Sequence, residues 1–201
     1  MSPGVLAYAL RALGEATEGY LRGSDIEKAG DTIMSCAVIA AVAGVGSGWL
    51  PGAGALVATA AWVAAIWGMY VKINKDLGIT IKDNVLKSLA SALLTNLIAS
   101  AGALILMLVG STLLSFIPGL GTVGAIAIDG AIGYVTVFAS GVLYIKLLTK
   151  LFKAGKGFNI SENNVENLAK DIISESDVKK IIKEGKNAFK EDQKAGKFKK
   201  K

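Results

Sequence analysis

The sequence contains no histidine, one cysteine and three prolines among its 201 residues. The single cysteine, Cys36, cannot form an internal disulfide, which excludes a disulfide-stapled secreted scaffold. Without histidine, the usual zinc sites, haem ligation and histidine-dependent catalytic triads have no ligand or base. We therefore expect a protein without enzymatic activity, and without a metal ion or other cofactor.

Charged side chains are also missing from two long stretches of the chain. Between Asp31 and Lys72 lie 40 residues without any charge, and between Lys87 and Lys146 lie 58 residues with only one, Asp129. A helix that crosses a bilayer needs about 20 mostly apolar residues. Each stretch is therefore long enough for two membrane-crossing helices.

Each apolar stretch is divided near its middle by a Pro-Gly turn signal. Proline ends the preceding helix and suits the first turn of the next, while glycine permits a tight reversal. The two signals are similar, which indicates a degenerate duplication of a helical hairpin. Two ordinary loops in a soluble bundle are the alternative. The turn residues are Pro51, Gly52 and Gly54 in the first signal, and Pro118, Gly119 and Gly121 in the second.

This pattern predicts an all-α protein of two apolar hairpins, with helices at about 25–48, 52–74, 81–115 and 119–153. Residues 1–23 form an amphipathic N-terminal helix, 24–153 a membrane hairpin domain, and 154–201 a basic soluble helical tail. One predicted face of the N-terminal helix consists of Val5, Leu6, Ala9, Leu10 and Leu13. The predicted apolar faces of the two tail helices consist of Val165, Leu168, Ile172, Ile173, Val178, Ile181, Ile182 and Phe189.

The two hairpins differ in their predicted affinity for a membrane. Residues 88–145 contain 25 Leu, Ile, Val or Phe, which favour insertion by at most roughly 7 to 15 kcal/mol. Asp129 opposes insertion by about 2.5 to 3.5 kcal/mol. The first hairpin has only 11 such residues among 40, against 17 Ala and Gly. Its insertion therefore depends on packing against the second hairpin.

Small residues at four-residue spacing are predicted to support that packing, because they let helix backbones approach closely in lipid. Alanine-rich and glycine-rich helices also produce such spacings by chance. The third helix offers Ser91, Thr95, Ala99 and Ala103. The principal helix-packing candidates are Gly44, Gly48, Ala64, Gly68 and Gly133.

The net charge of +6 arises entirely from residues 150–201, which carry 14 lysines and 8 acidic residues. Lysines flank the apolar stretches at 72–87 and 146–156, and neither Pro-Gly turn is charged. The positive-inside rule then places the N-terminus, central link and tail on the cytoplasmic side. We expect residence in a bacterial cytoplasmic membrane, with the lipid bilayer and not nucleic acid as the main partner. Tyr70 and Tyr144 are predicted interfacial anchors, although core aromatics would look similar.

Asp129 is an ionisable residue within an apolar helix, which makes it a candidate functional residue. It has no evident cationic partner, and burial in hydrocarbon disfavours its charged form. Its two interpretations are a proton- or ion-sensitive gate and a protonated, hydrogen-bonded side chain. Gly119, Gly121 and Gly124 match a dinucleotide-binding spacing, but no strand precedes them and the acidic partner is absent.

The segment Ile117-Pro118-Gly119-Leu120-Gly121-Thr122, with the following helix to Tyr144-Ile145-Lys146, resembles a bacterial family. This is the helical-hairpin domain of unknown function that accompanies Era-like GTPases and occurs in YcjF-type inner-membrane proteins. Leu50-Pro51-Gly52 and the helix to Lys72 are similar to the family's first hairpin. The resemblance spans about 30–152 and implies membrane association and a partner GTPase, without catalytic residues. A glutamine in the second helix and an attached GTPase domain are missing.

These observations leave three functions open. The first is a non-enzymatic membrane module that anchors or senses at the bilayer and presents its basic tail to a partner, such as a GTPase. The second is a pore-forming or membrane-perturbing toxin or effector that switches between soluble and inserted states. The third is a soluble lipid-binding bundle. The sequence leaves self-association undecided.

Overall fold

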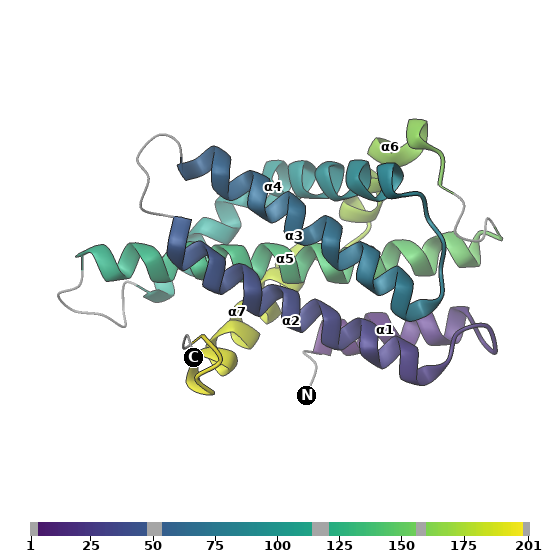
Figure 1. Ribbon diagram of the computed structural model, residues 1–201, viewed down its shortest axis with the longest axis horizontal. Helices are drawn as coiled ribbons and strands as arrows, with labels where there is room; N and C mark the ends of the chain where they lie inside the picture. Colours follow the sequence, from purple (N-terminus) through teal and green to yellow (C-terminus); the bar gives the residue numbers. More distant parts are fainter. Residues whose placement is uncertain (1–3, 48–53, 114–120, 156–159, 199–201) are drawn as a thin grey trace.

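The computed structural model describes residues 4–47, 54–113, 121–155 and 160–198, with side chains described over 4–43, 62–105, 130–155 and 160–198. These residues form seven α-helices and one 3-10 turn and contain no strand, which confirms the all-α prediction (Figure 1). The observed bounds lie within a few residues of those predicted for the four apolar helices. The elements are α1 Gly4–Ala16, α2 Gly23–Ser47, α3 Gly54–Leu77, α4 Asp83–Leu113, α5 Gly121–Lys153, η1 Glu162–Asn164, α6 Val165–Ser174 and α7 Val178–Lys194.

The amphipathic helices bury the faces that the sequence predicts. All five apolar residues predicted for the N-terminal helix are buried in α1. In α6 and α7, the predicted apolar residues are buried, except that Leu168 and Val178 are partly buried. Asp177 separates these two helices and caps α7, since its side chain accepts a hydrogen bond from the Lys180 backbone N–H at 2.9 Å.

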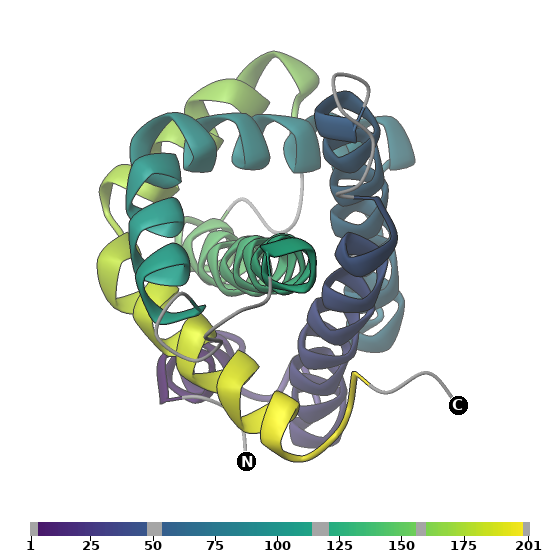
Figure 2. The same cartoon turned by 90° about the vertical axis from the view of Figure 1, so that its left-hand side faces the viewer.

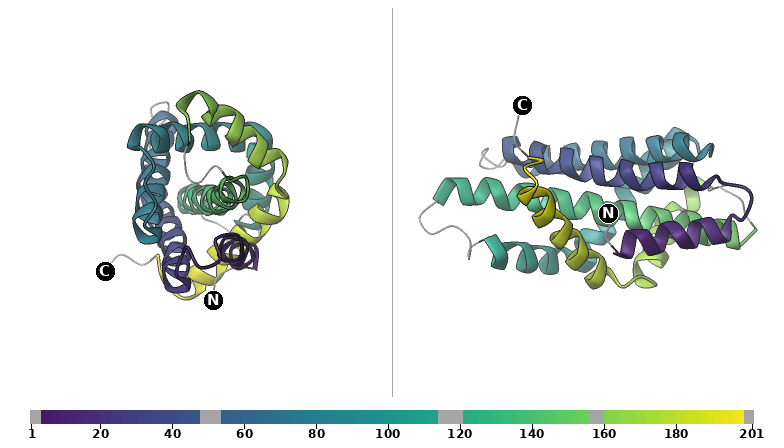
Figure 3. Two further views of the ribbon diagram at one scale, coloured as in Figure 1. Left: turned by 90° about the vertical axis from the view of Figure 1, so that its right-hand side faces the viewer. Right: turned by 90° about the horizontal axis from the view of Figure 1, so that it is seen from below.

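Helix α5 occupies the centre of the molecule. Figure 2 shows it nearly end-on with other helices around it, and the view from the opposite side in Figure 3 agrees. It contacts α1, α2, α3, α4, α6 and α7, most extensively α2. We call these six helices the shell. Because α6 and α7 belong to it, the basic tail packs on α4 and α5 in this structure.

The two ends of the molecule differ in how many charged residues lie at the ends of the apolar helices. The C-terminal ends of α2 and α4 and the N-terminal ends of α3 and α5 lie toward the same end (Figure 1). These are the helix ends next to the two uncharged Pro-Gly segments. The other end carries the lysines that close α3 and α5 and those that open α4, including Lys75, Lys87 and Lys153.

Candidate functional site: an apolar helix enclosed by a helical shell

Two helices among the described residues are long and apolar enough to cross a membrane, and they differ in how much of each is buried. In the segment Gly130–Lys153 of α5, 89% of an 18-residue apolar window is buried inside the molecule. In the segment Asp83–Ile105 of α4, only 44% of such a window is buried. Length and composition alone are weak signs of a membrane span, because a core helix of a soluble protein has both. The enclosure of the Gly130–Lys153 segment is therefore the feature that distinguishes α5 from α4.

Three glycines allow the shell to close around α5. A Cβ atom at Gly133 would lie 3.0 Å from the backbone oxygen of Ala40 in α2. At Gly141 it would lie 2.7 Å from the Ile33 side chain. At Gly185 of α7 it would lie 2.8 Å from Cδ1 of Phe138. Gly133 is thus one predicted packing residue that lies at a helix contact, whereas Gly141 and Gly185 were not predicted.

Other predicted packing residues face outward. Ala64 and Gly68 of α3 are exposed, and a Cβ atom at Gly68 would meet no heavy atom within 4 Å. The small residues predicted to pack on α4 are exposed as well: Ser91, Thr95, Ala99 and Ala103. In this structure these faces are turned outward, and their packing in lipid stays a prediction. They are turned outward because α3 and α4 turn their larger apolar side chains inward, which removes more apolar area from water.

Several predicted residues cannot be assessed. Pro51, Gly52, Pro118, Gly119 and Gly48 lie outside the described residues. Gly54 and Gly121 are the first residues of α3 and α5. Gly44 and Asp129 lie in α2 and α5, but what surrounds their side-chain positions is outside the described part of the chain. The roles assigned to all of these residues stay predictions.

Two tyrosines predicted as interfacial anchors are core residues in this structure. Tyr70 and Tyr144 are fully buried, and their rings stack with centroids 4.0 Å apart. The Tyr144 hydroxyl donates to Oδ1 of Asn74 at 2.6 Å, and the Tyr70 hydroxyl donates to the backbone oxygen of Ser140 at 3.2 Å. Because their hydroxyl groups are satisfied internally, these rings join α3 to α5 without contacting water.

A second aromatic cluster holds the end of α7 against α5. The Tyr134 hydroxyl donates to Oδ2 of buried Asp192 at 2.8 Å, and Lys197 lies 2.7 Å from Oδ1 of the same carboxylate. Phe189 and Phe198 stack on each other at 4.9 Å, and each meets the Tyr134 ring edge-on. We call these five residues the clasp. It joins the polar end of α7 to the most buried helix of the molecule.

Polar contacts at the surface join further parts of the shell. The Val5 backbone N–H of α1 donates to Glu184 of α7 at 2.6 Å. The Asn96 side chain of α4 donates to Oε1 of Glu166 in α6 at 3.1 Å. That hydrogen bond, together with Lys170, holds the pKa of Glu166 below its usual value. The Asn96–Glu166 contact is exposed, so it can be broken without creating a buried unpaired charge, whereas the Val5–Glu184 contact is partly buried.

Groups that could bind a metal ion or act as a nucleophile are few in the described part of the chain. Within it, no group of three His, Cys, Asp or Glu side chains lies close enough together to hold a metal ion. Cys36 is free and half-buried. The features that distinguish the described part of the molecule are therefore the enclosed helix, the clasp and the lysine-bearing end.

The comparisons with known proteins add no relative. No family model matches the chain, and no curated protein or solved structure is significantly similar to it. The resemblance to the GTPase-associated hairpin domain stays a prediction from the sequence.

Proposed function

We propose that this protein is a membrane-inserting helical protein that switches between the folded state described here and a state with its apolar helices in a bilayer. The observation that supports the proposal is the burial of Gly130–Lys153 inside a shell, where 89% of an 18-residue apolar window is buried. The shell includes two amphipathic helices, α6 and α7, which follow α5 in the chain. Such a shell keeps α5 out of water until a membrane replaces it. The function is bilayer perturbation or pore formation, without enzymatic chemistry.

The energetics of the proposed switch depend mainly on the shell. Helix α5 is removed from water in both states, so its own hydrophobic free energy differs little between them. Opening costs the contacts of α1, α6 and α7 with the apolar helices. Because these three helices have charged outer faces and apolar inner faces, they can lie in the membrane interface and recover part of that loss.

In the proposed inserted state, α2 pairs with α3 and α4 pairs with α5 as two hairpins. The segment 121–145 rises about 37 Å at about 1.5 Å per residue, enough for a hydrocarbon core of about 30 Å. The lysines at 72–87 and 146–156 then stay on one side, which is cytoplasmic for a bacterial inner membrane. A constitutive anchor that presents its tail to a GTPase is the competing proposal, and it requires α6 and α7 to leave α4 and α5.

A reversible tether between α5 and α7 tests the switch. The Cγ atom of Phe138 lies 3.5 Å from a Cβ atom built at Gly185, so Phe138→Cys with Gly185→Cys places a sulfur near bonding geometry. Both substitutions are made in a protein that also carries Cys36→Ser, so that the natural thiol cannot compete. We expect the oxidised protein to release dye from vesicles of phosphatidylcholine and phosphatidylglycerol at least about tenfold more slowly than after reduction.

Three results would contradict the proposal. Equal release by the oxidised and reduced forms would mean that α7 does not need to leave α5. Absence of vesicle binding by the reduced form, with a folded circular dichroism spectrum, would favour the soluble bundle. Stable vesicle binding without dye release would favour the anchor. The single variant Phe138→Cys, oxidised and reduced in the same way, is the control, because it cannot form the tether and leaves Gly185 without a Cβ atom.

A further inference from the structure

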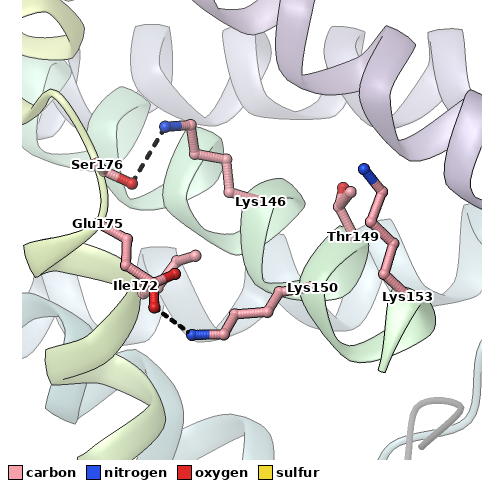
Figure 4. Close-up of a pocket in the computed structure, with 7 residues that line it drawn as sticks. All are labelled: Lys146, Thr149, Lys150, Lys153, Ile172, Glu175 and Ser176. Carbon is pink, nitrogen blue, oxygen red and sulfur yellow. Dashed lines mark hydrogen bonds and ion pairs between the residues drawn. The ribbon is translucent and has the colours of Figure 1, made fainter. Parts of the chain in front are cut away.

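A pocket of about 330 Å³ lies at the lysine-bearing end of the molecule, between the last turns of α5 and the segment that joins α6 to α7. Figure 4 shows the residues that line it. Helix α5 contributes three lysines, Lys146, Lys150 and Lys153. Their spacing of four and three residues places them on one face of the helix. Glu175, Ser176 and the buried Ile172 line the other side.

The residues that line the pocket carry more positive than negative charge, with three lysines against one glutamate. Lys150 is paired with Glu175 at 2.6 Å, whereas Lys146 donates only to the neutral hydroxyl of Ser176 at 3.1 Å. Lys153 is exposed and has no ion-pair partner in the part of the chain that the structure describes. Two ammonium groups are therefore left without a carboxylate in contact. Asp177 and Lys180 also act on Lys146, but their charges oppose each other.

We propose that this pocket binds a phosphate group. Lysine ammonium groups bind phosphate as point charges, and each supplies three N–H donors. A phosphate monoester has several acceptor oxygens and can bridge two or three ammonium groups at once, which a single hydroxyl or carboxylate cannot do as well. The phosphate can come from a lipid headgroup or from a free anion. A basic pocket beside an apolar residue is also typical of sites for anionic headgroups.

Phosphate binding would act on the shell, and this step depends on the proposed function. The two contacts Lys146–Ser176 and Lys150–Glu175 join α5 directly to the α6–α7 connection (Figure 4). A phosphate in the pocket competes with Ser176 and Glu175 for the same ammonium groups. Binding therefore weakens the attachment of α6 and α7 to α5 where an anionic membrane surface is present.

The site itself is tested without membranes, by titrating the folded protein with inorganic phosphate and following backbone amide shifts by NMR at fixed ionic strength. We expect saturable shifts that include residues 172–177. Lys153→Gln should weaken binding roughly tenfold, the effect of losing one charge-assisted hydrogen bond. Lys87→Gln, which removes the same charge from an exposed position on α4, should leave the affinity unchanged. Glu175→Gln should strengthen binding, because it removes the competing carboxylate.

Dye release from vesicles distinguishes the two sources of phosphate. Release from vesicles containing phosphatidic acid that slows with Lys153→Gln but not with Lys87→Gln would identify the lipid headgroup. Release that depends instead on added inorganic phosphate would identify the free anion. Equal losses of phosphate affinity in both lysine variants, or no saturable shifts at millimolar phosphate, would overturn the site. Specific phosphate binding without any dye release would keep the site and refute the membrane function.

Discussion

Replacing Tyr134 with phenylalanine removes one hydroxyl group from the clasp and leaves its ring contacts in place. The lost interaction is a buried hydrogen bond to the Asp192 carboxylate, and hydrogen bonds to charged groups contribute about 1.5 to 3 kcal/mol. Asp192 keeps its ion pair with Lys197, so the carboxylate is not left unpaired. We expect the free energy of unfolding to fall by about 1.5 to 3 kcal/mol for Tyr134→Phe.

The same substitution tests whether α7 must leave α5 before insertion. If detachment of the clasp precedes insertion, its equilibrium shifts by the same free energy, and every 1.4 kcal/mol changes it about tenfold. Dye release from vesicles should then accelerate roughly tenfold or more. Urea unfolding gives the stability and fluorescence dequenching gives the release rate. Tyr8→Phe is the matched control, because the Tyr8 side chain is 71% exposed and should affect neither measurement.

Two outcomes would refute this reasoning. An unchanged urea midpoint for Tyr134→Phe would mean that the hydrogen bond contributes nothing to the folded state. A lowered midpoint with an unchanged release rate would mean that insertion proceeds without detachment of the clasp.

Three further predictions concern glycine packing, the pH dependence of stability and the aspartate in the apolar helix α5. In a urea titration, Gly141→Ala should lower the free energy of unfolding by about 1 to 3 kcal/mol, because its methyl group would overlap an isoleucine of α2. Gly68→Ala, where a methyl group meets open space, should raise it by up to about 1 kcal/mol in the same titration. Glu166 has a lowered pKa in the folded state, so its contribution is present above the unfolded value of 4.5 and is lost as the pH falls through the folded value. As the pH is lowered below 4.5, the urea midpoint should therefore fall less steeply for Glu166→Gln than for the wild type. Asp129→Asn should speed dye release at neutral pH, because moving a carboxylate to the bilayer centre costs about 2.5 to 3.5 kcal/mol; an unchanged rate would mean that Asp129 does not enter the hydrocarbon.

Helix positions and amphipathic faces were predictable from the sequence because they depend on local patterns. The buried face of α1 follows from the spacing of its apolar residues, and Leu13 illustrates this, being fully buried as predicted. The uncharged stretches likewise predicted the approximate bounds of α2, α3, α4 and α5. Such patterns report which side of a helix is apolar, and they require no knowledge of its neighbours.

The arrangement of the helices was not predictable in the same way. A predominantly apolar helix such as α5 has the same sequence pattern whether lipid or protein surrounds it. The contact of Gly185 with Phe138 joins residues 47 positions apart, and no local pattern marks that glycine. The clasp depends on a similar separation, since Tyr134 and Asp192 lie 58 positions apart. Outward-facing Gly68 shows the converse, a local packing motif that the folded arrangement does not use.

The order of the shell along the chain has a consequence for synthesis. Helices α6 and α7 are translated after α5, with roughly 40 residues between Lys153 and Lys194. At about 5 to 20 residues per second, a ribosome needs roughly 2 to 8 s for that distance. During this interval two of the six shell helices have not been made, so the apolar segment of α5 is only partly covered. Targeting factors and chaperones that scan emerging polypeptides therefore meet it before the finished fold can hide it.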